Sequence, residues 1–172
     1  MAMMWIFTYY ILCINLNSIK VIPNLLFYIQ RSLNTNTVVY EANFDNNGIL
    51  IKDNPINTHW IMYEKNGELE ALSYIEKKMA YGIKCIPTNT EQQFIIQLTA
   101  DKTHSFILKQ LAPFKAIITT EIDGITIKLT RLFVEADNSS IWPKINYIII
   151  EGIGQKSNKT ITKQFIPTKT PL

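Results

Sequence analysis

The residues best suited to bind a ligand lie between Trp60 and Gly82 and on the first predicted strand. Tyr and Trp side chains combine an apolar ring with a polar tip, so they often line ligand pockets. An arginine can form two parallel hydrogen bonds with a carboxylate. A plainer interpretation is a helix that closes one end of a β domain, with its tyrosines packed at the core edge. We take six residues as candidates for ligand binding: Arg31, Trp60, Tyr63, Glu76, Lys77 and Tyr81.

Carboxylates suggest a second kind of chemistry in the same segment. Several glutamates lie close together between residues 64 and 76. A glycosidase needs two carboxyl groups at a set separation across a cleft, and a sequence does not give that separation. Acids near turns also fit a solvated rim. A hydrolase of envelope material that uses Glu76 with Lys77 or Tyr81 therefore stays an alternative, and no residue is assigned as catalytic.

Motifs for the common cofactors and metals are missing from the sequence. It has no phosphate-binding loop, no Gly-x-Gly-x-x-Gly, no Cys-x-x-Cys, no His-Glu-x-x-His, no Gly-x-Ser-x-Gly and no calcium loop. The two histidines, His59 and His104, lie on separate predicted elements, and zinc usually needs three or four ligands. Cys85 is interpreted as a buried apolar residue. We therefore predict no metal site and no cofactor.

Composition and charge limit the classes of protein to which this chain can belong. Of the 172 residues, 47% are hydrophobic and 18% are charged, which is enough apolar material for a folded core. The formal net charge is +3, and the lysines are scattered along the chain. Nucleic-acid-binding domains usually gather basic residues on one face or helix, so nucleic acid is not an expected partner.

The first 20 residues resemble an export signal. Residues 3–16 form an uncharged apolar run, shorter than the roughly 20 residues that a membrane-spanning helix needs. We expect a cleaved signal peptide, but no Lys or Arg precedes the run and no Ala-x-Ala site follows it. Three alternatives stay open: a short membrane anchor, a buried first strand, and lipid attachment at Cys13. The domain limits are 1–20 for the signal or anchor, 21–167 for a single β-rich domain and 168–172 for a frayed tail.

Apolar and polar side chains alternate along most of the chain after residue 21, a period typical of β-strands. The Asp123-Gly124 pair predicts a type I′ hairpin turn, because both residues must adopt positive φ. The fold class is therefore all-β: an antiparallel β-sandwich or, as the alternative, a closed β-barrel. Strands are predicted over residues 24–32, 37–44, 58–64, 68–72, 92–100, 105–111, 114–122, 125–134, 145–151 and 160–166.

One short α-helix is predicted around residues 74–81. Ser73 followed by Glu76 has the spacing of a capping box, in which each side chain bonds the other residue's backbone N–H. Gly82 suits the left-handed position that often ends a helix. Ile75 and Met79 are four residues apart, so both are expected to face the core. The helix is too short to be stable without packing.

Three segments together resemble an uncharacterised bacterial family, domain-of-unknown-function 4833. They are LFYIQRSLNTNTVVY (26–40), HWIMY (59–63) and LSYIEKKMAYG (72–82). The family pattern is a Phe-x-Ile-x-Arg-Ser opening, a Tyr/His-Trp-Ile segment and an Ile-Glu-x-Lys-x-Ala-Tyr-Gly helix. The resemblance covers about Leu25 to Ile166 and implies export and one compact domain, but no activity. The family-like positions are Arg31, Trp60, Glu76, Lys77, Tyr81 and Gly82.

The sequence favours a non-enzymatic, exported β domain that binds a ligand or an envelope protein. Any site is expected near the helix and the first strand. The expected location is the periplasm or the cell envelope, with membrane contact only through residues 1–20 if they are retained. Beside the hydrolase, a structural module of an envelope assembly is the other alternative.

Overall fold

The computed structural model describes residues 22–137 and 144–166, so the predicted signal segment and tail lie outside the described residues. The described part consists mainly of strands and contains one short helix, which confirms the all-β class. The elements are β1 (Leu25–Arg31), β2 (Asn34–Ala42), β3 (Ile56–Met62), β4 (Glu68–Ala71), α1 (Tyr74–Glu76), β5 (Ile83–Pro87), β6 (Gln93–Leu98), β7 (Asp101–Ala112), β8 (Lys115–Ile122), β9 (Ile125–Asp137), β10 (Lys144–Gly154) and β11 (Thr160–Phe165).

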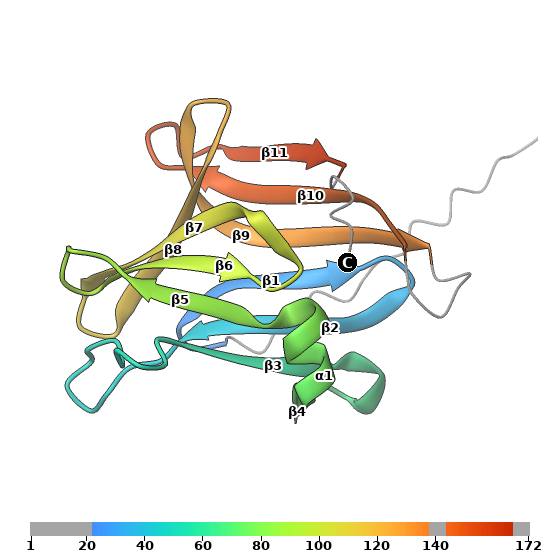
Figure 1. Cartoon of the computed structure of the whole chain (residues 1–172), viewed down its shortest axis with the longest axis horizontal. Coiled ribbons are helices and arrows are strands. Elements are labelled where there is room, and N and C mark those ends of the chain that lie inside the picture. Colours follow the sequence, from blue (N-terminus) through green and yellow to red (C-terminus); the bar gives the residue numbers. More distant parts are fainter. Residues whose placement is uncertain (1–21, 138–143, 167–172) are drawn as a thin grey trace, which may run out of the picture.

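The strands form one 11-stranded sheet. Its main path runs β4-β3-β2-β1-β9-β8-β7-β6-β5, and β10 and β11 continue from the other edge of β9. Figure 1 shows that this sheet curls round on itself. The architecture is therefore an open half-barrel, which has the continuous sheet of a barrel without its closure among the described strands.

β9 joins the two halves of the sheet. Its first residues pair with the end of β8, and the turn between them has positive φ at Asp123 (50°) and Gly124 (77°), as predicted. Further along the same edge, β9 pairs in parallel with β1, where Arg31 lies opposite Val134. All other strand pairs are antiparallel in the described part of the chain.

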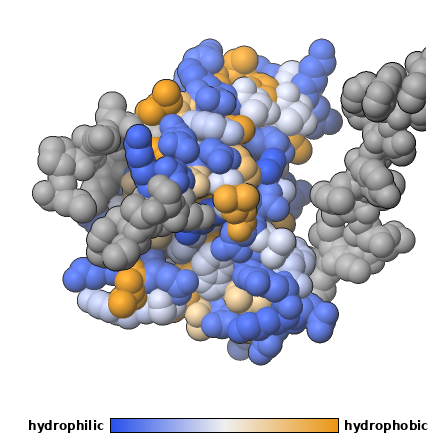
Figure 2. Space-filling model, turned by 90° about the vertical axis from the view of Figure 1, so that its right-hand side faces the viewer, coloured by the Kyte–Doolittle hydropathy of each residue, from blue (hydrophilic) through white to orange (hydrophobic). Residues whose placement is uncertain are grey.

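The core occupies part of the concave side of the half-barrel. Phe27 of β1 stacks on Tyr40 of β2 with ring centroids 4.2 Å apart, and Phe106 of β7 lies 6.4 Å from Phe27. All three rings are fully buried. On the face in Figure 2, polar residues predominate and apolar residues form separate small patches. Burial of the apolar side chains on the concave side is the main source of stability for the curled sheet.

The helical segment connects β4 to β5, the two ends of the main strand path. It therefore spans the open side of the half-barrel, next to both edge strands (Figure 1). Only Tyr74–Glu76 is α-helical, and a π-helical turn, Lys77–Tyr81, continues it. A 3-10 turn, Tyr63–Lys65, lies between β3 and β4. Among the described residues, no helix has the length and apolar character needed to cross a membrane.

The helix differs from the prediction at its C-terminal end. Gly82 has φ −66° and ψ 159°, so the left-handed cap predicted there is wrong. A glycine is needed for another reason: a Cβ at this position would lie 1.9 Å from the Lys77 carbonyl oxygen. The close approach lets the chain leave the π-helical turn directly into β5. A hydrogen bond from Thr99 N to Gly82 O (2.8 Å) lies just before the first β5–β6 pair, Ile83 with Leu98.

Candidate ligand pocket

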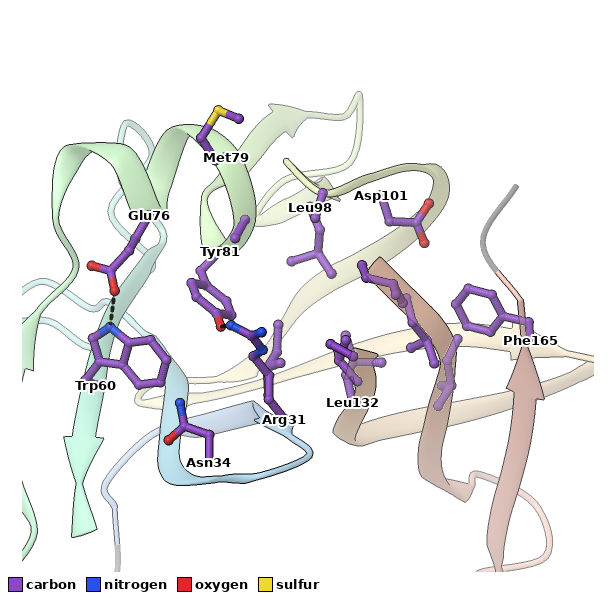
Figure 3. A pocket seen from close by; sticks show the side chains of 18 of the residues that line it. Arg31, Asn34, Trp60, Glu76, Met79, Tyr81, Leu98, Asp101, Leu132 and Phe165 are labelled. Carbon is purple, nitrogen blue, oxygen red and sulfur yellow. Dashed lines mark hydrogen bonds between the residues drawn. The ribbon is translucent and has the colours of Figure 1, made fainter. Parts of the chain in front are cut away.

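A pocket of about 480 Å³ opens on the concave side of the half-barrel, beneath the helical segment. Aliphatic and aromatic side chains make up most of its lining (Figure 3). The lining residues come from β1, β2, β3, the helix, β6, β7, β9, β10 and β11. A pocket built from so many strands has a largely fixed shape, because most of its lining residues are held by the sheet.

Strand alternation explains which side chains reach the pocket. Leu132, Val134 and Ala136 are two residues apart on β9, so they share a face, and all three line the pocket. On β1 the same alternation places Ile29 and Arg31 on the pocket face. The parallel register sets Arg31 beside Val134. An arginine is thus placed at the border of an aliphatic surface.

Arg31 and Tyr81 meet at this border. Arg31 Nη1 donates to the Tyr81 hydroxyl oxygen at 3.5 Å, and both side chains point into the pocket (Figure 3). A second hydrogen bond fixes the backbone of Tyr81: the buried Tyr40 hydroxyl donates to the Tyr81 carbonyl oxygen at 2.8 Å. Burial raises the pKa of the Tyr81 phenol and outweighs the opposing influence of Arg31, so the phenol stays protonated near neutral pH.

Glu76 is bound on both carboxylate oxygens. Trp60 Nε1 donates to Oε1 at 3.0 Å, while the Ser73 backbone N–H (2.8 Å) and hydroxyl (2.7 Å) donate to Oε2. This is the capping box that the sequence predicted. Burial alone would raise the pKa of Glu76, but the Ser73 and Trp60 hydrogen bonds outweigh it and lower the pKa below its usual value. Trp60 also packs edge-on against Tyr81, with ring centroids 5.1 Å apart.

Ile75 and Met79 do not face a closed core, so that prediction is wrong. Their exposed fractions are 70% and 46%. Both side chains nevertheless line the pocket. The physical reason is that the helix crosses a hollow rather than a packed interior, so its apolar side borders the opening of that hollow.

The far side of the pocket carries a second polar pair. Asp101 of β7 lines the pocket, and its Oδ2 lies 2.6 Å from His104 Nδ1. Asp101 Oδ1 also accepts from the His104 backbone N–H at 3.3 Å. The His104 ring lies against Phe165 of β11, with centroids 4.5 Å apart. From the sequence, His104 was considered only as a possible metal ligand, and Asp101 and Phe165 were not identified. The spacing Asp-x-x-His was the available signal.

The structure brings four of the six candidate residues to the pocket and leaves two outside its lining. Arg31, Trp60, Glu76 and Tyr81 line it, although they are up to 50 positions apart in the sequence. Tyr63 is 46% exposed in the 3-10 turn after β3, and Lys77 is exposed on the helix. Neither of these two side chains lines the pocket.

Two other acidic side chains near the helix, Glu64 and Glu70, have partners outside the pocket. The Asn36 amide donates to the Glu64 carboxylate, and Lys65 Nζ lies 3.0 Å from Glu70 Oε2. These contacts agree with a solvated rim. In the described residues no three His, Cys, Asp or Glu side chains are grouped to hold a metal ion.

Cys85 lies on β5 and packs partly buried against the core. Burial raises the pKa of its thiol to about 11, so the thiol is protonated near neutral pH and is a weak nucleophile. This agrees with the interpretation of Cys85 as an apolar packing residue.

Residues 27–164 match the family described as Domain of unknown function (DUF4833). The matched stretch includes β2–β10 and nearly all of β1 and β11, and it contains every residue that lines the pocket except Phe165. No curated protein and no solved structure matches the chain. Since the match covers well over half of the 172 residues, the chain belongs to the DUF4833 family.

Proposed function

We propose that the protein is a non-enzymatic binding module of the cell envelope whose pocket takes a small, mainly apolar ligand. The observation that carries this proposal is the hollow of about 480 Å³ on the concave side of the half-barrel. Pockets for small molecules usually measure about 300–1,000 Å³ and are lined by apolar groups with a few polar ones. This pocket has both properties.

The size of the hollow argues against ordinary packing. Protein interiors are packed about as densely as organic crystals and contain few voids larger than a water molecule. Exposed apolar surface on the scale of this lining costs free energy when the pocket is filled with water. A ligand that covers the partly exposed Val134, Ile145 and Ile148 would recover that free energy, which supports a role in binding.

The pocket's carboxylates fit binding better than hydrolysis. A glycosidase acid needs a pKa raised toward neutral, so that it is protonated when it acts. The hydrogen bonds to Glu76 lower its pKa and hold both of its oxygens in place. Glu76 therefore serves to fix the helix over the pocket and to orient Trp60.

The envelope location rests on the sequence of residues 3–16, which resembles the apolar region of a secretory signal. Cell envelopes contain many apolar and amphiphilic molecules, so an exported protein with such a pocket would encounter suitable ligands there. Fusion of residues 1–25 to a reporter enzyme that is active only after export tests this part separately. Reporter activity outside the inner membrane is expected, and activity confined to the cytoplasm would overturn the location.

The binding proposal is tested with N-phenyl-1-naphthylamine, a neutral dye that fluoresces in apolar surroundings. We expect the full chain to enhance the dye fluorescence in a saturable way. The Val134→Trp variant should bind the dye at least about tenfold more weakly, because its bulky ring would fill the hollow. Phe133→Trp is the matched control, since Phe133 is the neighbouring residue on β9 but is not part of the lining.

Two results would count against the binding proposal. One is a dye signal that does not saturate. The other is equal binding by the Val134→Trp and Phe133→Trp variants, provided that circular dichroism shows both to be folded.

A further inference from the structure

Resting on the proposed function, we infer that the natural ligand is an amphiphile with one carboxylate head, held at Arg31 and Tyr81, and an aliphatic tail. The pocket has one polar border and a long apolar surface, and these two parts match the two parts of such a molecule.

The proposed head-group site consists of side chains that donate hydrogen bonds. Arg31 is the cationic residue among the lining residues that the structure describes. Its planar guanidinium matches the geometry of a carboxylate. The Tyr81 hydroxyl oxygen accepts from Arg31 Nη1, so the phenol proton remains available to donate toward the same place. Asn34, which also lines the pocket, lies on the same side as Arg31 in Figure 3.

The two acidic lining residues are directed to donors within the chain. Glu76 accepts from Trp60 and Ser73, and Asp101 contacts His104 through both of its oxygens. Hydrogen bonds spread and stabilise the charge of these carboxylates. An anionic head at Arg31 would therefore meet acids whose charge is already stabilised by neighbouring donors.

The tail has an apolar path away from Arg31. In Figure 3 the side chain of Leu132 lies between Arg31 on one side and Phe165 on the other, with Leu98 above. Further aliphatic surface comes from β10 through Ile145, Ile148 and Ile150. Each buried methylene contributes about 0.8 kcal/mol in ordinary hydrophobic transfer, so the tail would supply most of the affinity and the head would select the chemical class.

A single carboxylate fits better than a phosphate monoester. One lining arginine matches one negative charge, whereas sites for doubly charged phosphates usually combine several cationic or backbone donors. The lining contains no lysine among the described residues. A monocarboxylate with a medium-length chain therefore agrees with the single lining arginine and with the volume of the pocket.

The test is competition against N-phenyl-1-naphthylamine by three compounds with the same tail: dodecanoate, dodecan-1-ol and dodecylamine. At about pH 8 they carry a negative, a zero and a positive head charge respectively. We expect dodecanoate to displace the dye with at least about tenfold higher affinity than dodecan-1-ol, because hydrogen bonds to charged groups are stronger than neutral ones. Dodecylamine is expected to be the weakest competitor.

Arg31→Gln should abolish the preference for dodecanoate over dodecan-1-ol and leave dye affinity nearly unchanged. Arg131→Gln is the matched control, because Arg131 lies on β9 outside the lining and bonds Gln30 Oε1 at 2.7 Å. If Arg31→Gln does not fold by circular dichroism, the wild-type comparison of the three compounds decides the question alone.

The outcomes separate the two proposals. Saturable dye binding with equal displacement by dodecanoate and dodecan-1-ol would overturn this inference and leave the apolar pocket intact. Stronger displacement by dodecylamine would place the head at Glu76 or Asp101 and also overturn it. Failure of the dye itself to bind at saturable sites would overturn the proposed function and this inference together.

Discussion

The Trp60 indole donates a 3.0 Å hydrogen bond to Glu76, and this bond fastens the helix to β3. The same carboxylate caps the helix through Ser73, so one side chain both begins the helix and anchors it. Because this helix spans the open side of the half-barrel, the anchoring contact also determines the shape of the pocket (Figure 3).

Glu76→Ala is expected to destabilise the fold by about 1–2 kcal/mol, because it removes the hydrogen bonds that Trp60 and Ser73 donate to the carboxylate, and a typical hydrogen bond contributes about 0.5–1.5 kcal/mol. Urea unfolding followed by circular dichroism measures the change. Glu70→Ala is the control, since Glu70 contacts the exposed Lys65 and loss of a solvent-exposed ion pair should change the stability much less. Equal effects of the two substitutions would show that Glu76 does not anchor the helix.

The stability that Glu76 contributes should depend on pH. Its folded pKa is lowered from 4.5, so the contribution is complete above that value and is lost as pH falls through the folded pKa. The difference in unfolding free energy between wild type and Glu76→Gln should therefore be constant above about pH 6 and shrink on acidification. A difference that grows as the pH falls would contradict the assigned hydrogen bonds.

Gly82→Ala is expected to cost about 2–3 kcal/mol, because the added methyl would overlap the Lys77 carbonyl oxygen at 1.9 Å and the backbone must shift. Gly124→Ala is the matched control. Gly124 has φ 77° but no atom within 4 Å of its added Cβ, so only the backbone cost of about 1 kcal/mol applies. Thermal unfolding compares the variants, and a smaller effect at Gly82 than at Gly124 would rule out the close approach.

Tyr40→Phe should destabilise the protein by about 1–2 kcal/mol, since it leaves the buried Tyr81 carbonyl without the 2.8 Å hydrogen bond from β2. The ring stacking on Phe27 is kept, so the loss reports the hydroxyl alone. Tyr74→Phe is the control, because Tyr74 is 76% exposed. Chemical denaturation that finds no difference between these variants would refute a role for the Tyr40 hydroxyl.

Local patterns in the sequence were sufficient to predict most elements. Alternation located the strands to within a few residues in most cases, and the Asp123-Gly124 turn and the Ser73–Glu76 capping box formed as predicted. These features depend on neighbours within a few positions, which is why one sequence is enough to find them.

The long-range arrangement could not be predicted from the same patterns. Alternation says which face a residue occupies but not which strand lies beside it. The parallel pair of β1 and β9 was therefore not foreseen, and the choice between two stacked sheets and one curled sheet stayed open. β5 was missed, because it is short and ends at Pro87, which is tolerated there since β5 is an edge strand. Asp101 and Phe165 reach the pocket only through this long-range arrangement.

The most direct test of the binding account is methyl NMR of the full chain during titration with dodecanoate. The account predicts saturable shifts of the Leu98, Leu132 and Val134 methyl signals, all from lining residues. The Leu108 and Ile118 methyls, buried in the core away from the lining, should stay in place. Shifts spread evenly over both groups, or no saturable shift at the lining methyls, would contradict the claim that this hollow is a binding site.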